Sequence, residues 1–196
     1  MPQLVYEGAA SYPTWSPDGT RLAYAAQNAG GDWDIFVVPV DGSAPPKRIE
    51  RGWAPVWGPT GVLAFDACEE GGGACGIFLD NPDDDAPPVR YTASANDVPC
   101  SWSPDGQNLA FMSDAGGSWD VLLLNVSGGV AQVTSDPGIE ALPAWAPDGS
   151  GLAFLSNRDG AWGIYLMRPD GGEQRKLLDI GTADPGWRTE RLAWGW

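Results

Sequence analysis

The sequence predicts an all-β fold in which one four-stranded unit recurs about every 43 residues. A tryptophan returns at intervals of 42, 45, 43 and 42 residues, at Trp15, Trp57, Trp102, Trp145 and Trp187. A Leu-Ala-aromatic triplet follows each tryptophan in step, and 27 glycines with 18 prolines favour short elements joined by tight turns. No segment shows the 3.6-residue apolar periodicity of a helix. Four short antiparallel strands in a unit of about 40 to 45 residues are typical of a β-propeller blade.

Each unit opens with a short strand that carries the tryptophan and runs into a tight turn. The turn reads Pro-Asp-Gly in three copies, where proline presets φ and glycine adopts a conformation that side chains hinder. The aspartates Asp18, Asp105 and Asp148 recur at the same place in these turns. We expect them to accept backbone N–H bonds within the turn, and we expect the repeated tryptophans to pack between blades.

The other three strands of a unit differ in polarity. The second carries the Leu-Ala-aromatic triplet and leads into a polar, glycine-rich loop. The third is a nearly continuous apolar run, which suits a strand covered on both faces, as between stacked blades. The fourth is amphipathic and is expected to be outermost. The apolar runs are 35–38, 77–79, 121–124 and 164–167.

These copies divide a single domain, residues 1–196, into blades. Four units span approximately 11–50, 51–92, 97–134 and 140–178. A degraded fifth copy contains Trp187, and residues 3–6 resemble a fourth strand without the rest of its blade. We therefore predict five blades, the last assembled from 184–196 and 3–6, which would remove exposed strand edges. The alternative is an open fragment of a larger ring.

The unit Pro-x-Trp-Ser-Pro-Asp-Gly-x-x-Leu-Ala-Phe resembles the WD-like repeat of the TolB family of β-propellers. Residues 156–165, SNRDGAWGIY, are similar to the segment that follows in that family. The resemblance covers nearly the whole chain and implies the fold. Because such propellers serve as periplasmic scaffolds, surface or sensor domains and gating domains of peptidases, it implies no single function. The second copy departs from the pattern at 58–61, and the fifth lacks the turn.

The charge balance restricts the classes of partner. Eleven basic and 26 acidic residues give a formal net charge of −15, which disfavours nucleic acid and anionic membrane surfaces. No stretch is long and apolar enough for a membrane span, and no signal peptide opens the chain. Basic partners or divalent cations fit better, although acidity that only keeps the surface soluble is the alternative. We expect a monomer.

Three cysteines bear on the compartment. Cys68 and Cys75 flank a glycine-rich hairpin tip, so a disulfide between them is expected, with two free thiols as the alternative. A disulfide indicates an extracytoplasmic location, periplasmic, secreted or at the cell surface, for a domain without its own signal peptide. Cys100 is left over as a small buried residue. With no histidine present, a structural zinc site is not expected.

Catalytic signatures are absent from the sequence. Without histidine, a serine or cysteine nucleophile lacks its usual base. There is no G-x-S-x-G elbow and no phosphate-cradling loop in a plausible context. A glycosidase-like acid pair on the first strands is not expected, because small residues precede the repeated tryptophans there. We therefore expect no enzymatic activity and no catalytic residues.

A set of residues shortly before the repeated tryptophans is the candidate binding site. These residues approach one channel mouth if the ring closes: Glu7, Trp53, Asp97, Glu140 and Asp184. Oxygen ligands from Asp97, Glu140 and Asp184 suit calcium, and a solvated acidic rim is the alternative. We therefore expect a non-catalytic interaction propeller for a protein, peptide or glycan. The alternatives are a purely structural domain and a gating propeller of a peptidase.

Overall fold

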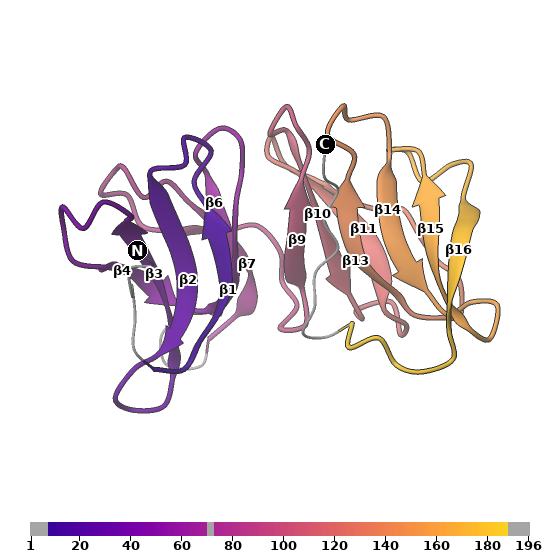
Figure 1. Cartoon of the computed structure of the whole chain (residues 1–196), viewed down its shortest axis with the longest axis horizontal. Coiled ribbons are helices and arrows are strands. Elements are labelled where there is room, and N and C mark those ends of the chain that lie inside the picture. The colour runs from indigo at the N-terminus through magenta and orange to yellow at the C-terminus, as the bar shows by residue number, and fades with distance from the viewer. Residues whose placement is uncertain (1–7, 70–72, 188–196) are drawn as a thin grey trace. The chain divides into compact units, whose positions relative to one another are not determined.

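The computed structural model describes residues 8–69 and 73–187, in which all regular structure is β-strand. Sixteen strands form four sheets of four antiparallel strands each (Figure 1). The described residues include no helix long and apolar enough to cross a membrane. The chain divides into two compact units, residues 1–95 and 96–196, each of which holds two sheets.

The first unit contains blades 1 and 2, in which the strands follow one another in sequence order. Blade 1 consists of β1 (Ala10–Trp15), β2 (Arg21–Gln27), β3 (Trp33–Pro39) and β4 (Lys47–Arg51). Blade 2 consists of β5 (Trp53–Trp57), β6 (Leu63–Cys68), β7 (Cys75–Asp80) and β8 (Val89–Arg90). A single residue, Gly52, separates the outermost strand of blade 1 from the innermost strand of blade 2.

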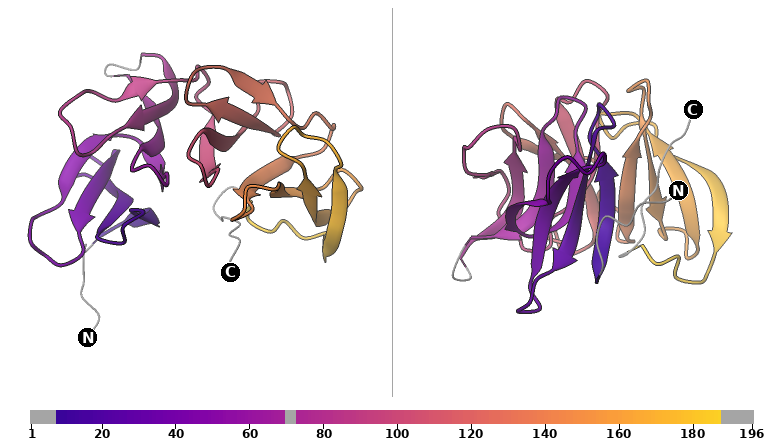
Figure 2. Two further views of the ribbon diagram at one scale, coloured as in Figure 1. Left: turned by 90° about the horizontal axis from the view of Figure 1, so that it is seen from above. Right: turned by 60° about the vertical axis from the view of Figure 1, so that its left-hand side comes forward.

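The second unit repeats this arrangement in blades 3 and 4 (Figure 2). Blade 3 consists of β9 (Val98–Trp102), β10 (Asn108–Ser113), β11 (Asp120–Asn125) and β12 (Val130–Gln132). Blade 4 consists of β13 (Glu140–Trp145), β14 (Leu152–Ser156), β15 (Trp162–Met167) and β16 (Arg175–Gly181). The sequence thus predicts the four-stranded unit correctly in all four copies.

The core of each unit lies between its two sheets and contains the repeated tryptophan of the second sheet. In the first unit, Trp57 packs with Ile35 and Val37 of blade 1 and with Phe65 of blade 2. In the second unit, Trp145 occupies the corresponding place between blades 3 and 4. The apolar third strands are covered because one of their faces lies in this shared core.

Trp15 behaves differently from the other repeated tryptophans. Its side chain is 60% exposed, because no described sheet precedes blade 1. Trp187 of the degraded fifth copy is buried and contacts Trp119 and Trp162 within the second unit.

The predicted count of five blades is corrected to four for the part of the chain that the structure describes. Of the predicted closing blade, residues 3–6 and 188–196 lie outside the described residues, and 184–187 form no strand. The sequence offers a physical reason, because the fifth copy has Arg-Thr-Glu where the others place a tight turn with glycine.

The turn aspartates have the structural role expected from the sequence. The Asp18 carboxylate accepts hydrogen bonds from the Ser16 hydroxyl and from the Thr20 amide and hydroxyl. The bond from Ser16, followed by those from Thr20, lowers the pKa of Asp18 to about 2. Asp105 and Asp148 accept equivalent bonds within their own turns.

A bulge in the first strand recurs in all four blades. The pairing of the first two strands shifts at this point. In three blades it brings a non-glycine residue to positive φ, namely Tyr12, Ala54 and Leu142. A bulge inserts an extra residue and re-aims the side chains that follow. The residues before the bulge therefore project differently from what uninterrupted alternation predicts.

Candidate functional site

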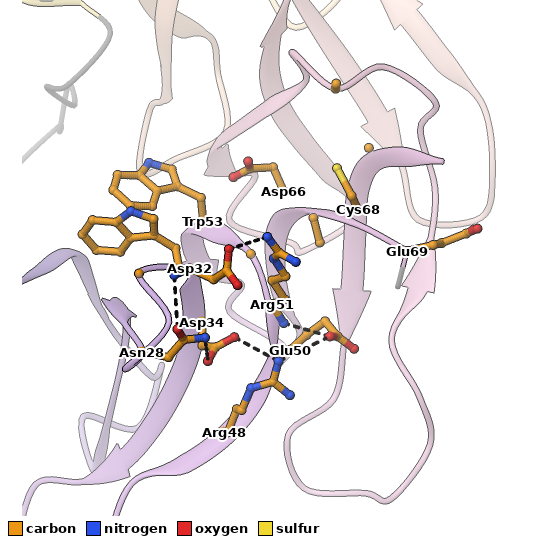
Figure 3. Close-up of a pocket in the computed structure, with 16 residues that line it drawn as sticks. Asn28, Asp32, Asp34, Arg48, Glu50, Arg51, Trp53, Asp66, Cys68 and Glu69 are labelled. Atoms are coloured by element: carbon orange, nitrogen blue, oxygen red, sulfur yellow. Dashed lines mark hydrogen bonds and ion pairs between the residues drawn. The ribbon is translucent and has the colours of Figure 1, made fainter. Parts of the chain in front are cut away.

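The first unit holds a cleft of about 780 Å³ between the loop ends of blades 1 and 2 (Figure 3). Its walls come from the β2–β3 loop, the outer strand β4, the β4–β5 connection, and the ends of β6 and β7 that meet at the hairpin tip. All lining residues belong to the first unit. The cleft contains one of the predicted binding residues, Trp53.

Two arginines on β4 reach this cleft because the strand contains a bulge. Arg48 and Arg51 are three residues apart, an odd spacing that places side chains on opposite faces of a regular strand. Here Arg48 pairs with Phe36 and Arg51 with Asp34, two residues apart on β3, so one extra residue is accommodated on β4. Both guanidinium groups therefore emerge on the same side and line the cleft.

Carboxylates of blade 1 hold the two arginines in place. Arg51 forms an ion pair with Asp32 at 2.5 Å, and Arg48 forms one with Asp34 at 2.9 Å. Asp34 is buried, which opposes its ionisation, but the hydrogen bonds from Arg48 and Asn28 outweigh this effect and lower its pKa. Asp34 is therefore ionised at neutral pH and fixes one wall.

Aromatic rings form the wall next to these ion pairs. The half-buried rings of Trp33 and Trp53 meet edge to face, with centroids 3.9 Å apart, and Tyr12 contacts Trp53 at 5.2 Å. Trp53 also packs against the shared core of the two sheets. Contacts on several sides hold the indole of Trp53 in one orientation, which favours recognition without a large entropic cost.

Asp66 is the direct cross-strand partner of Trp53 in the pairing of β5 with β6. Both residues are half-buried and line the cleft, and both are labelled in Figure 3. Directly paired residues have their Cβ atoms about 4.5–5.5 Å apart. An indole and a carboxylate are thus fixed side by side on one sheet face.

The hairpin tip that borders the cleft is covalently closed. Cys68 and Cys75 are joined by a disulfide across the ends of β6 and β7. Next to it, Glu69 forms an ion pair with Arg90 of β8 at 3.3 Å. Both Cys68 and Glu69 line the cleft. The disulfide therefore limits how far this rim can move.

Two glycines allow the strands to approach closely beneath the cleft. A Cβ atom on Gly52 would lie 2.6 Å from the carbonyl oxygen of Asp66, and one on Gly76 would lie 2.2 Å from that of Thr92. Any side chain at either position would force backbone atoms apart. Glycine at both places therefore preserves the close packing of the strands that border the cleft.

The charge of the cleft is negative overall. Five carboxylates and two guanidinium groups line it, a formal balance of three negative charges. Opposed charges on a partly apolar wall suit a ligand that carries a cation and a hydrogen-bonding backbone.

The other predicted binding residues lie elsewhere. Glu7 is outside the described residues. Asp97 and Glu140 belong to the second unit and are buried. Asp184, also in that unit, is exposed and accepts a hydrogen bond from the amide of Gly186. The structure gives no shared site for these residues.

The strand register explains why the predicted binding residues include both Trp53, which lines the cleft, and Glu140, which is buried. Glu140 pairs with Ser156 in blade 4, whereas Trp53 pairs with Asp66 in blade 2, one step further along the strand. The blade 2 residue equivalent to Glu140 is therefore Gly52. A step of one residue turns a strand side chain to the other face. The side chains of Trp53 and Glu140 consequently point to opposite faces of their sheets and have different neighbours.

Glu140 is the centre of a buried polar network in the second unit. Its Oε1 accepts a hydrogen bond from Ser156 at 2.8 Å and lies 3.5 Å from Arg158, and its Oε2 has no hydrogen-bond partner. Arg158 also pairs with Asp136 at 2.8 Å and donates to Gln174. Burial raises the pKa of Glu140 to about 7 against the opposing effects of Ser156 and Arg158.

Calcium at Asp97, Glu140 and Asp184 stays a prediction. Within residues 8–69 and 73–187, no three histidine, cysteine, aspartate or glutamate side chains are grouped so that they hold a metal ion. The Glu140 carboxylate is already engaged by Ser156 and Arg158.

Several residues of the cleft escape prediction from the sequence. Arg48 and Arg51 depend on a bulge that no local signal encodes. Asp66, in contrast, interrupts the Leu-Ala-aromatic strand at a place where the other blades have Ala25, Met112 and Leu155. Comparison of the copies with one another would have identified it.

Comparison with known proteins gives a consistent picture of the fold. A protein family described as the TolB beta propeller domain matches residues 89–189. No curated protein sequence matches the chain. The residues matched by the family, 89–189, contain blades 3 and 4 and the last strand of blade 2.

Solved structures resemble the chain over most of its length. A protein assigned as TolB from Agrobacterium tumefaciens has a TM-score of 0.77 and 22% identity, covering 90% of this chain and 65% of that one. TolB from Acinetobacter baumannii has a TM-score of 0.72 and 20% identity, and the match covers 88% of this chain and 44% of that one. The β-propeller domain of the Trilobed protease from Pyrococcus furiosus has a TM-score of 0.63 and 14% identity, and the match covers 86% of this chain and 57% of that one. The chain thus spans less than two thirds of each, and identities this low indicate the fold alone.

Proposed function

Because the chain belongs to the TolB beta propeller domain family, we propose that it is a non-catalytic binding propeller that holds an extended segment of a partner protein in the cleft of its first unit. The observation that carries this proposal is the cleft itself, with the fixed indole of Trp53 beside the Asp66 carboxylate. A concave site with an aromatic wall and a few oriented polar groups is the usual form of a recognition site.

An extended segment fits the cleft better than a compact ligand. The opening lies between two sheets, and its lining combines charged groups with the two neighbouring indoles of Trp33 and Trp53. A peptide in extended conformation presents alternate side chains to such walls. A glycan stacked on an indole is the other ligand predicted from the sequence, and the same variants test it.

Binding without catalysis is supported by the chemistry of the lining. The chain contains no histidine, and the lining carboxylates Asp32 and Asp34 form ion pairs with arginines. A general acid needs a proton to donate near neutral pH, which the lowered pKa of Asp34 opposes.

Selection from a peptide library tests the proposal. A displayed library of random dodecapeptides is selected on the wild-type chain and counter-selected on the double variant Trp53→Val, Asp66→Ala. These substitutions copy the residues of blades 3 and 1 at the same positions, Val98 and Ala25. We expect sequences that bind the wild type and not the variant. Equal recovery on both proteins would contradict the proposal, and a melting curve shows whether the variant is folded.

A gating propeller of a peptidase is the second candidate. It is favoured by the likeness to the propeller domain of the Trilobed protease and to a puromycin-hydrolyzing peptidase from Mycobacterium tuberculosis, with a TM-score of 0.66. This role requires a catalytic domain in the same protein. Sequencing of the flanking gene regions distinguishes the two candidates.

The compartment and the assembly of the domain are further parts of the proposal. The disulfide supports an extracytoplasmic location. The burial of Trp187 against Trp119 and Trp162 supports a structural role for this residue within the second unit. A chain shortened after residue 183 should therefore melt at a lower temperature, and an unchanged melting temperature would count against this role.

A further inference from the structure

The four blades act as internal controls for one another, because they share a fold and differ in their loop ends. The cross-strand pair that holds Trp53 and Asp66 in blade 2 has a direct counterpart in each of the others. The counterparts are Ser11 with Ala25, Val98 with Met112, and Ala141 with Leu155. The second member of each counterpart pair is apolar and buried.

Blade 2 therefore departs from the repeat at both members of one pair. Three blades build the same sheet with small or aliphatic residues there, so the fold requires neither an indole nor a carboxylate. A carboxylate on a second strand that is otherwise apolar at this position is costly unless it is well solvated or paired. Both departures line the same cleft, which indicates that they serve recognition.

The chemistry of the pair favours a cation. The face of an indole attracts an ammonium or guanidinium group through its quadrupole, and a neighbouring carboxylate adds a charge-assisted hydrogen bond. The cleft carries three more negative than positive formal charges, and the whole chain has a formal net charge of −15. This field concentrates positively charged ligands near the opening.

The arginines of the cleft do not make it a site for anions. Arg51 is engaged by Asp32, and Arg48 by Asp34 and more distantly by Glu50. An anionic ligand would share each guanidinium group with a carboxylate that is already bound to it, and it would meet the remaining carboxylates of the cleft. A cationic side chain beside Trp53 and Asp66 is attracted by these carboxylates instead.

We propose that the Trp53–Asp66 pair is the seat of a lysine or arginine side chain, carried by an extended basic segment of a partner protein. The inference rests on the proposed function of the cleft and names the chemistry that the cleft selects. The fixed indole contacts the alkyl stem and charged head, and Asp66 pairs with the head. The disulfide-closed rim keeps the β6–β7 hairpin beside the seat.

Defined peptides test the seat directly. The probe is an acetylated, amidated peptide of sequence Gly-Ser-Arg-Gly-Arg-Ser-Gly, and its control has citrulline in place of both arginines, which keeps shape and hydrogen bonding but removes the charge. Affinities are measured by calorimetry at roughly physiological ionic strength, where non-specific attraction is screened beyond about 8 Å.

Matched variants distinguish binding at the Trp53–Asp66 pair from the general electrostatic attraction of a negatively charged chain. Asp66→Ala removes one charge inside the cleft, and Asp85→Asn removes one charge from an exposed residue in the β7–β8 turn, at the opposite end of β7 from the cleft. A Trp53→Phe variant keeps an aromatic ring with a weaker cation interaction. Melting curves of all variants confirm that they are folded.

We expect the arginine peptide to bind the wild type, Asp66→Ala to weaken binding by about tenfold or more, and Asp85→Asn to leave it almost unchanged. Trp53→Phe should give an intermediate loss. Equal binding of the citrulline peptide, or equal losses from Asp66→Ala and Asp85→Asn, would overturn the cation seat. If library peptides without basic residues still depend on Trp53 and Asp66, the binding function stands and only the cation seat fails.

Discussion

The loop ends of blades 2 and 4 occupy the same place in the repeat but differ in what fills them. In blade 4, Glu140 and Ser156 pair across the first two strands, and Arg158 closes a buried polar network over them. In blade 2 the equivalent positions are Gly52, Ala67 and Glu69, and the space is an open cleft. The same backbone thus uses its polar groups for stability in one blade and leaves room for a ligand in the other.

This difference teaches where substitutions should affect stability and where they should affect binding. A buried ion network is costly to break, because removing one partner leaves a charge without compensation. An exposed ion pair at the rim of a cleft contributes little. Substitutions in the buried network of blade 4 should therefore affect stability more than substitutions at the cleft of blade 2.

Arg158→Ala should be the most destabilising change. It leaves the fully buried Glu140 without its cation, and it also removes the partner of Asp136. We expect a loss of about 2–3 kcal/mol at pH 8, measured by denaturant unfolding, because protonation of Glu140 limits the cost of its lost cation while the bonds of Arg158 to Asp136 and Gln174 are lost as well. The matched change in blade 2, Glu69→Ala, removes only the exposed pair with Arg90 and should cost less than about 1 kcal/mol. Similar losses in the two variants would refute the contrast.

Glu140 should make stability depend on pH. Its pKa is raised from 4.5 to about 7 in the folded state, chiefly by burial. Between these values the folded protein binds the proton more tightly than the unfolded chain, so stability is fully present below pH 4.5 and falls as the pH rises to about 7. The loss attributable to this group is at most about 3 kcal/mol.

Glu140→Gln isolates this contribution. The amide keeps a hydrogen-bonding oxygen near Ser156 but does not titrate, so the variant should lose less stability than the wild type between pH 5 and pH 8. Asp80, whose pKa burial raises to about 6, affects both proteins alike and cancels in the difference. An identical dependence on pH in the two proteins would show that Glu140 is ionised throughout.

The disulfide should contribute an intermediate amount of stability to the first unit. Replacing Cys68 and Cys75 by serine opens a loop with a sequence separation of 7 residues. Loop-closure entropy then gives a loss of about 2 kcal/mol. Guanidinium unfolding of the wild type with and without reductant checks the value, and reductant should leave the double serine variant unchanged. A loss below about 0.5 kcal/mol would mean that the rim is held by other contacts.

Asp66→Ala should have the smallest effect on stability, within about 0.5 kcal/mol, because blade 1 already has Ala25 at this position. The reciprocal substitution in blade 4, Leu155→Asp, buries a carboxylate in an apolar cluster and should cost several kilocalories per mole. Thermal unfolding of both variants provides the comparison. If Asp66→Ala proved strongly destabilising, Asp66 would be a structural residue of blade 2.

Much of the fold follows from the sequence because its signals are local. The spacing of Trp57 and Trp145 and the turn at Asp18 place the strands within a few residues of those observed. The site is less predictable. The distance from the repeated tryptophan predicts Trp53 as a binding residue, but that distance does not fix the face to which a side chain points, so it predicts Glu140 for the same set. Arg158, only two residues beyond Ser156, closes over Glu140 through long-range contacts that no periodicity reveals.

The most direct test of the account follows single indole N–H signals by NMR while the selected peptide is titrated into the isotope-labelled chain. Trp53 in blade 2 and the buried Trp162 in blade 4 are assigned from their phenylalanine variants. The account predicts that the signal of Trp53 shifts in a saturable way and that the signal of Trp162 does not move. A shift of Trp162 with a stationary Trp53 would place binding at blade 4 and contradict the central claim.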